Sequence, residues 1–137
     1  MSSKSIETVL HNIIKKARIA SKDVSRYFSE NRVVKYADLI SDDVFPPGKS
    51  VLIGDGVKAT KEIQGHRVRF HTEMPKGSHL GLHRHDCFEG TMILEGGEIV
   101  DIETGNVFTH SFYLQPGQSH NLVALEDSIL IVDFYPV

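Results

Sequence analysis

The stretch Gly77–Gly96, GSHLGLHRHDCFEGTMILEG, decides how the rest of the chain is interpreted. It holds His79, His83, His85 and Glu89 within eleven residues and has a glycine at each end. Because side chains two residues apart in a β-strand point to the same side, His83 and His85 present their imidazoles together. With the carboxylate of Glu89 past a bend or on the next strand, they make three ligands suited to a divalent metal of borderline softness.

A further histidine, His120, lies downstream in the sequence GQSH, just after the turn-prone pair Pro116-Gly117. It enters another predicted strand and is a fourth candidate ligand. The residues themselves leave a second interpretation open: the histidines could be buried core residues whose ring nitrogens are hydrogen-bonded within the protein and bind no metal. His79 is too far along its strand to be a ligand, and we expect it at a loop edge.

After the turn Pro46-Pro47-Gly48, the sequence consists of short alternating runs between turn residues, a pattern typical of an all-β domain. In residues 66–74, Val68, Phe70 and Met74 alternate with polar residues, as in a half-buried strand. Similar short runs follow in TMILEGGEIVDIETGN, VFTHSFYLQPG, NLVAL and SILIVDFYPV. Many short strands at this spacing predict a sandwich or a closed barrel.

The histidine-rich stretch resembles the first motif of the cupin superfamily, G-x5-H-x-H-x3,4-E-x6-G. Gly77, His83, His85, Glu89 and Gly96 fill every fixed position of that motif. The match is specific because each residue type stands at a set spacing.

The second cupin motif, G-x5-P-x-G-x2-H-x3-N, is kept only in part. Gly117 and His120 match it. Thr109, Gln115 and Ala124 stand where the motif has its first glycine, its proline and its asparagine. The missing residues mostly serve turns and packing. The motif's histidine is therefore present as His120, and the geometry of the loop before it is left open.

The resemblance covers about residues 50–137 and implies a small antiparallel double-stranded β-helix, the jelly-roll barrel of cupins. It implies one divalent transition metal inside the barrel, held by His83, His85, Glu89 and His120. Imidazole and carboxylate suit iron, zinc, manganese, nickel and copper alike, and iron is favoured here. If the metal takes five or six ligands, open positions remain, as in catalytic rather than structural sites.

The N-terminal segment differs from the rest. From Ile6 to Phe28, apolar residues recur at steps of three and four, which predicts one amphipathic helix. The opposite face is basic and carries Lys15, Arg18, Lys22 and Arg26. That face could meet an acidic membrane surface, a nucleic-acid backbone or an acidic partner, or it could simply be solvated while the apolar stripe packs on the protein or on a second copy.

Charge is divided unevenly along the 137 residues. Residues 1–36 carry about +5 and the remainder about -8, which together give the net charge of -3. We therefore predict an N-terminal basic helix and extension over 1–36 and a barrel domain over 37–137. The acidic domain argues against general nucleic-acid binding. With one cysteine, no apolar leader and no membrane-length segment, the expected location is the cytoplasm.

Several weaker candidates accompany the metal ligands. If the polar face of residues 66–74 lines the barrel, Arg69 could bind an anionic substrate and His71 could act as acid or base. If that face meets solvent, both are ordinary surface residues. Tyr113 and Tyr135 border a pocket or cap the barrel. By strand parity, Cys87 faces the pocket, although a bend near Glu89 would change this.

The sequence supports more than one function. The first hypothesis is a metal-dependent enzyme acting on a small organic molecule, with a dioxygenase favoured because two histidines and a carboxylate resemble the ligands of non-haem iron oxygenases. Redox-free isomerases and lyases use similar sites. The second hypothesis is a ligand-binding or sensing module without catalysis. A storage or structural role has no use for four intact ligands. A homodimer is expected.

Overall fold

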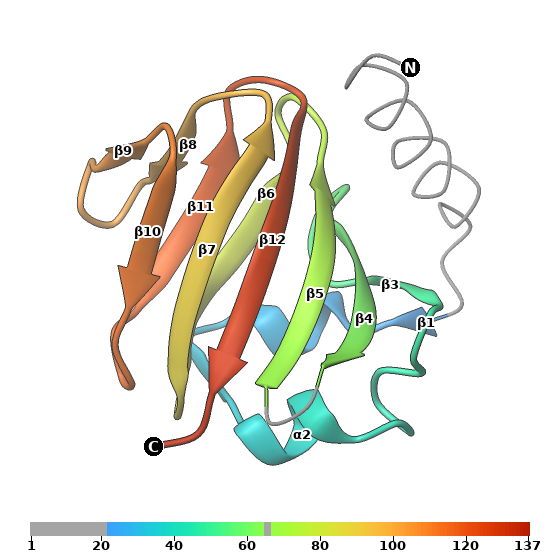
Figure 1. Ribbon diagram of the computed structural model, residues 1–137. Helices are drawn as coiled ribbons and strands as arrows, with labels where there is room; N and C mark the ends of the chain where they lie inside the picture. The colour runs from blue at the N-terminus through green and yellow to red at the C-terminus, as the bar shows by residue number, and fades with distance from the viewer. Residues whose placement is uncertain (1–21, 65–66) are drawn as a thin grey trace, which may run out of the picture.

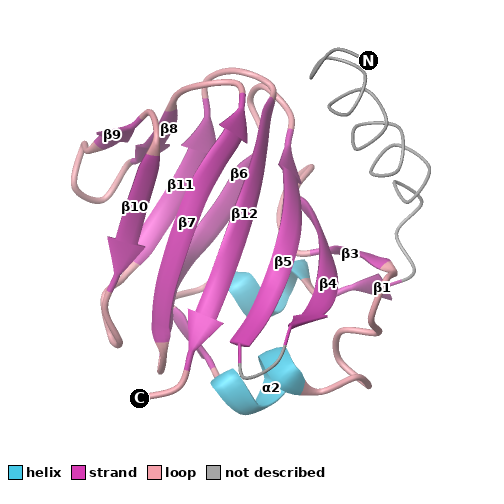
Figure 2. Cartoon of the chain, in the orientation of Figure 1, coloured by secondary structure: helices cyan, strands magenta, loops and turns pink. Residues whose placement is uncertain are grey.

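The computed structural model describes residues 22–64 and 67–137, which form two β-sheets packed face to face (Figures 1 and 2). The larger sheet has the order β1-β3-β4-β5-β12-β7-β10 and the smaller one β2-β6-β11-β8-β9. The elements are β1 (Lys22–Asp23), the 3-10 helix η1 (Ser25–Phe28), β2 (Arg32–Val34), α2 (Tyr36–Ile40), β3 (Ser50–Leu52), β4 (Lys58–Gln64), β5 (Arg67–Met74), β6 (His79–His85), β7 (Phe88–Glu95), β8 (Ile99–Asp101), β9 (Val107–Phe108), β10 (Ser111–Leu114), β11 (His120–Ala124) and β12 (Ser128–Tyr135). The predicted all-β architecture is confirmed.

Strand alternation decides which side chains enter the space between the sheets. On β5, Val68, Phe70 and Met74 are buried, as the sequence pattern predicts. β12 lies between β5 and β7 and is antiparallel to both. In the smaller sheet, β6 and β11 are antiparallel, and their register places His83 opposite His120.

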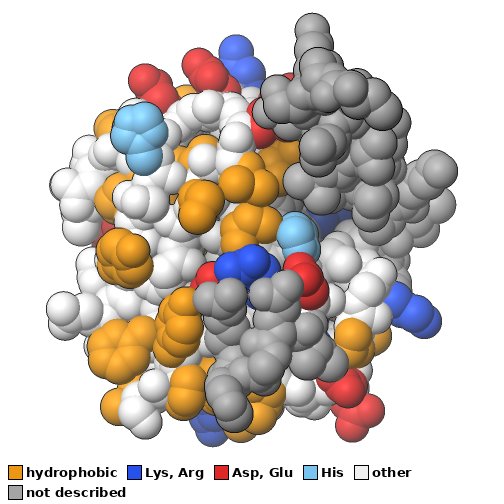
Figure 3. Space-filling view, viewed as in Figure 1, with side chains coloured by type: hydrophobic (Ala, Val, Ile, Leu, Met, Phe, Trp, Pro, Cys, Tyr) orange, Lys and Arg blue, Asp and Glu red, His pale blue; other side chains and the backbone are white. Residues whose placement is uncertain are grey.

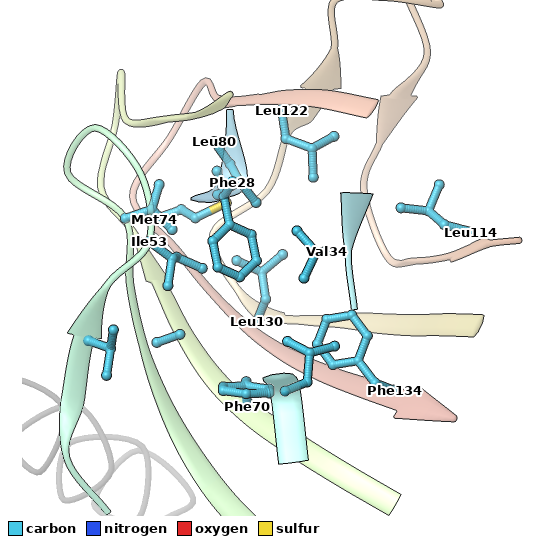
Figure 4. Packing of buried hydrophobic residues seen from close by; sticks show 14 of the residues in the cluster. Phe28, Val34, Ile53, Phe70, Met74, Leu80, Leu114, Leu122, Leu130 and Phe134 are labelled. Carbon is cyan, nitrogen blue, oxygen red and sulfur yellow. The ribbon is translucent and has the colours of Figure 1, made fainter. Parts of the chain in front are cut away.

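The core fills the space between the two sheets, and Figure 4 shows its packing. A chain of aromatic rings crosses it. The ring centroids of Phe28 and Phe45 are 6.0 Å apart, those of Phe45 and Phe70 are 5.0 Å apart, and those of Phe70 and Phe134 are 5.7 Å apart. All three contacts are edge-on, the arrangement that aromatic pairs favour. The rings therefore tie the N-terminal segment to the larger sheet.

The helix expected to run to Phe28 does not reach that residue. Residues 6–21 lie outside the described residues, but residues 22–28 form β1 and η1 instead of an α-helix. The physical reason is local. The Asp23 carboxylate accepts hydrogen bonds from Ser25 N at 2.9 Å and from Ser25 Oγ at 2.6 Å. These bonds close a local turn, which competes with the backbone hydrogen bonds of an α-helix. Val24 N also donates to Leu52 O at 2.8 Å, which ties this stretch to β3.

Residues after η1 close one end of the barrel. β2 runs parallel to β6, and α2 covers the lower end of the sheets in Figure 1. The buried Lys61 holds this cover in place, because its Nζ donates to Leu39 O at 3.3 Å and to Ser41 O at 3.1 Å and pairs with Asp42 at 3.1 Å. The division of the chain at residue 36 stays a prediction, although residues 22–36 contribute two strands.

Among the described residues, no helix has the length and apolarity needed to cross a membrane.

The two glycines that bound the histidine-rich stretch both occupy turns. Gly77 has φ +81° and Gly96 has φ +89°, values that residues other than glycine adopt only with backbone strain. Gly96 is constrained further, since a Cβ there would lie 2.1 Å from Asp127 O. The turn after β7 therefore requires glycine for two separate reasons.

We predict that Gly96→Ala destabilises the protein by about 2 kcal/mol or more, because the backbone strain and the clash with Asp127 O add. The matched control is Gly105→Ala, where φ is +78° but a Cβ would meet nothing within 4 Å. It should cost only about 1 kcal/mol, from the backbone alone. Urea unfolding of both variants measures the difference, and equal losses would contradict the close approach.

Candidate metal centre

Three histidines from two neighbouring strands meet inside the barrel. β6 supplies His83 and His85, and β11 supplies His120. One nitrogen from each lies within 4.8 Å of the others. All three side chains are buried, with His83 and His120 at 0% exposure. The sequence spacing thus becomes a spatial cluster, because the register of β6 and β11 places His83 and His120 opposite each other.

Backbone carbonyls orient two of these imidazoles. His83 Nδ1 lies 2.6 Å from Gly81 O, and His120 Nδ1 lies 3.3 Å from Gln118 O. A carbonyl only accepts, so each ring carries its proton on Nδ1 and leaves a lone pair on Nε2. A ligating histidine is commonly held by such a bond from its other nitrogen.

The remaining nitrogens of the three rings have no hydrogen-bond partner among the described residues. The Nε2 atoms of His83, His85 and His120 are buried and make no hydrogen bond there. A buried polar atom without a partner costs about 1–3 kcal/mol. Three such atoms pointing at one place fit a divalent metal, which would satisfy all of them at once. The number and type of these donors therefore fit a divalent metal.

Glu89 reaches the cluster from the other sheet, on β7. Its Oε1 lies 3.2 Å from His85 Nε2, but the two atoms are not aligned as a hydrogen bond. Thr91 Oγ1 donates to Oε2 at 2.9 Å and fixes the carboxylate. Burial raises the pKa of Glu89, but the contacts with His85, His120 and Thr91 outweigh burial and hold it at about 2. The carboxylate is therefore charged and adjacent to the imidazoles, although it is not part of the group within 4.8 Å.

The two carbonyl-bound histidines are held neutral. Burial lowers the pKa of His83 well below its ordinary value, and the neighbouring His120 and His85 lower it further. Burial also lowers the pKa of His120, against the attraction of Glu89. Neutral imidazoles are the form that binds metals.

A small cavity adjoins the cluster at His85 and Glu89. Its volume is about 40 Å³. Besides those two residues, only Thr72 and Thr91 among the lining side chains are polar. The apolar walls are Phe28, Leu39, Phe45, Ile53, Ala59, Phe70, Met74, Leu80, Phe112, Leu122, Leu130, Val132 and Phe134. A small molecule held there would lie beside His85 and Glu89, in surroundings that are mostly apolar.

The weaker candidates lie elsewhere. Arg69 and His71 are on the face of β5 that points away from the barrel interior, opposite to buried Phe70. Arg69 Nε donates to Asp133 Oδ1 at 2.7 Å, and His71 Nε2 lies 2.5 Å from Glu62 Oε2. The structure does not bring either residue to the histidine cluster.

Tyr113 is also on the outside. It is 81% exposed and lines a shallow groove with Tyr135 and Asp133 on the outer face of the larger sheet. Figure 3 shows hydrophobic side chains gathered on that face, over β7, β10 and β12. Exposed Met92 and Leu94 belong to the same face. Tyr113 therefore borders a surface groove and not the interior cavity.

The remaining two candidates, His79 and Cys87, make contacts that stabilise the fold and do not take part in the cluster. His79 Nε2 is hydrogen-bonded to Asn121 Oδ1, away from the cluster. Cys87 is 1% exposed and does not line the cavity. Burial, together with the negative charges of Asp86 and Glu89, raises the pKa of its thiol to about 12. The thiol is protonated and packs as an apolar group.

Sequence reasoning missed part of the cavity wall. Phe28, Leu39 and Phe45 come from the segment that precedes the cupin-like region, yet they line the cavity. Phe28 was assigned to a helix face, and nothing in the residues around Leu39 signals contact with the site. The turn at 46–48 after Phe45 is the only local signal that the chain changes direction there.

We predict that the metal-free protein loses stability as pH falls from about 7 to about 5. In the unfolded chain, His83 and His120 take up protons near pH 6.5, whereas their lowered pKa values keep them neutral in the fold. The stability is therefore present above about pH 6.5 and declines below it, by up to about 1.4 kcal/mol per pH unit for each group. Urea unfolding after chelator dialysis measures the slope. His83→Leu should make the slope shallower, and a flat profile in the unaltered chain would contradict buried neutral histidines.

Comparison with known proteins gives a match by structure alone. No protein-family model matches the chain, and no curated protein does. A chain of the Rhodobacter sphaeroides complex of SigE with the anti-sigma ChrR aligns with a TM-score of 0.55 and 21% identity, over 62% of this chain and 47% of that one. The present chain thus spans about half the length of that relative.

Two further structures align over larger shares of their own length. An RmlC-like cupin from Shewanella frigidimarina has a TM-score of 0.53 and 24% identity, over 65% of this chain and 84% of that one. An acetylacetone dioxygenase from Acinetobacter johnsonii has a TM-score of 0.52 and 16% identity, over 70% of each chain. With its two facing sheets and its inward histidines, the chain has the fold of the cupin superfamily.

Proposed function

We propose that this cupin is a metal-dependent enzyme acting on a small organic molecule, and that its chemistry is of the dioxygenase type. The observation that carries the proposal is the convergence of His83, His85 and His120, whose buried Nε2 atoms make no hydrogen bond. With Glu89 as the fourth ligand, a divalent metal bound there supplies a Lewis acid and, if it is iron, redox chemistry with O₂.

The side chains around the cluster prepare it for that role. The carbonyl oxygens of Gly81 and Gln118 hold two imidazoles with their lone pairs inward. Thr91 fixes Glu89, so the carboxylate is positioned before a ligand arrives. The apolar cavity beside His85 and Glu89 keeps water away from a bound molecule, which strengthens electrostatic interactions within the site.

The choice among reactions rests on weaker support. The acetylacetone dioxygenase from Acinetobacter johnsonii has the same fold, and this is why O₂ chemistry is tested first. Zinc, manganese or nickel at the site would favour a redox-free isomerase or lyase instead. The substrate of the A. johnsonii enzyme is not carried over, because the likeness is one of fold.

A sensing module is the second candidate function. One structure of similar fold comes from a complex of SigE with the anti-sigma ChrR, and this likeness is the reason to consider a regulatory role without catalysis.

A homodimer also stays a prediction. Its support is the apolar area on the outer face of the larger sheet, where Met92, Leu94 and Tyr113 are exposed. Contiguous apolar surface of this kind is common where subunits meet.

We expect protein purified without a tag or chelator to contain about one metal per chain. His83→Ala and His120→Ala should each lose at least nine-tenths of it, because each removes one of three converging Nε2 atoms. Elemental analysis measures the content. The matched control is His110→Ala, since His110 is exposed and is not a member of the cluster.

The identity of the metal then directs the assay. Iron justifies screening small apolar molecules for O₂ uptake, and consumption of O₂ that both cluster variants lack would support the dioxygenase. Metal without turnover on any class of substrate would favour the sensing module. Absence of metal under all growth conditions and after reconstitution would overturn the proposal.

A further inference from the structure

We propose that Phe28 sets the upper size of the ligand that reaches the metal centre, and that this ligand is compact and apolar beyond the atoms that bind the metal. The inference rests on the proposed function, since it concerns the molecule bound at that site. It adds a specificity-determining residue from outside the cupin-like region and a class of ligand.

The cavity is small and almost wholly apolar. Its volume of about 40 Å³ has room for about three water-sized groups. The polar side chains that line it are His85, Glu89, Thr72 and Thr91, and Thr91 is already bonded to Glu89. Among the described residues that line it, none is a lysine or an arginine. The part of a ligand that does not touch the metal therefore meets carbon, and a second charged group there would be buried without a partner.

Phe28 lies where the cavity meets the histidines. Its ring centroid is 5.4 Å from that of His83 and 6.5 Å from that of His85. The side chain is 3% exposed. Figure 4 shows its ring in the middle of the core cluster, with Ile53 and Leu130 nearby. The ring of Phe134 is nearer to His85, at 4.9 Å, but Phe28 is in ring contact with both His83 and His85, so a ligand that extends from His85 along His83 would have to occupy the space that the Phe28 ring fills.

The backbone that carries Phe28 is fixed from two sides. A Cβ at Gly81 would lie 3.2 Å from Phe28 O and 2.9 Å from Ser29 Cβ, so η1 lies directly against β6. Tyr27 OH donates to Asp38 on α2 and accepts a hydrogen bond from Lys35 N at 3.0 Å. Because both neighbours of Phe28 are held, the ring is a fixed wall, and it limits ligand size in the resting fold.

The experiment uses cobalt(II) as the metal and imidazole and 4-phenylimidazole as neutral probes that bind through the same nitrogen. Cobalt absorption in the visible range reports both metal loading and probe binding. We expect Phe28→Ala to raise the affinity for 4-phenylimidazole about tenfold or more, and the affinity for imidazole about threefold or less. In Phe28→Ala, 4-(imidazol-4-yl)benzoate, whose carboxylate is at the far end of the probe from the metal-binding nitrogen, should bind about tenfold more weakly than 4-phenylimidazole.

Controls separate the possible failures. Leu125→Ala, at an exposed position outside the cavity lining, should leave both affinities unchanged. Phe28→Leu keeps most of the core volume and should give an intermediate gain if Phe28→Ala folds poorly by circular dichroism. Failure of the unaltered protein to bind cobalt would overturn the proposed function. Cobalt binding with equal gains for both probes in the Phe28 variants, or tight binding of the carboxylate, would overturn this inference alone.

Discussion

The rest of the structure depends on the antiparallel pairing of β6 with β11. That register sets His83 opposite His120 and, with His85 two residues on, directs three imidazoles into the interior. Their Nε2 atoms are buried without partners, which costs free energy that the fold alone does not recover. A metal that these nitrogens bind would satisfy them and couple its own binding to folding. The arrangement is best understood as a site prepared for an ion.

The second constraint is the closure of the barrel by residues that precede the cupin-like region. β2 pairs with β6 beside the histidines, and α2 is fastened to β4 through the buried Lys61. This segment contributes Phe28, Leu39 and Phe45 to the cavity. The common fold thus supplies the cluster, whereas the added segment shapes the space in front of it. Differences in specificity between cupins of similar fold can arise in this way, since fold alone does not assign a function.

The sequence predicted that His83 and His85 lie side by side because that information is local, whereas the approach of His120 is a non-local contact that only the resemblance implied. Strand parity places His83 and His85 on one side, and the positive φ of Gly77 and Gly96 explains why glycines bound the stretch. Parity also separated the apolar face of β5 from its polar one, and the structure places the polar face, with Arg69, outside the barrel. The failures concern non-local contacts. The apolar spacing predicts a helix as far as Phe28 because it contains no sign of the hydrogen bonds between Asp23 and Ser25 or of the pairing of residues 22–23 with β3. The cavity wall depends on tertiary packing and has no local pattern.

We propose that one metal is held jointly by the three Nε2 atoms and Glu89. The most direct measurement is a crystal structure of the purified protein with anomalous diffraction recorded at the absorption edge of the metal that it contains. Joint binding of one metal predicts a single peak about 2.1 Å from each of the three Nε2 atoms, with a Glu89 oxygen also in its coordination shell. A peak elsewhere, or ordered water alone bonded to the three Nε2 atoms in protein reconstituted with metal, would contradict it.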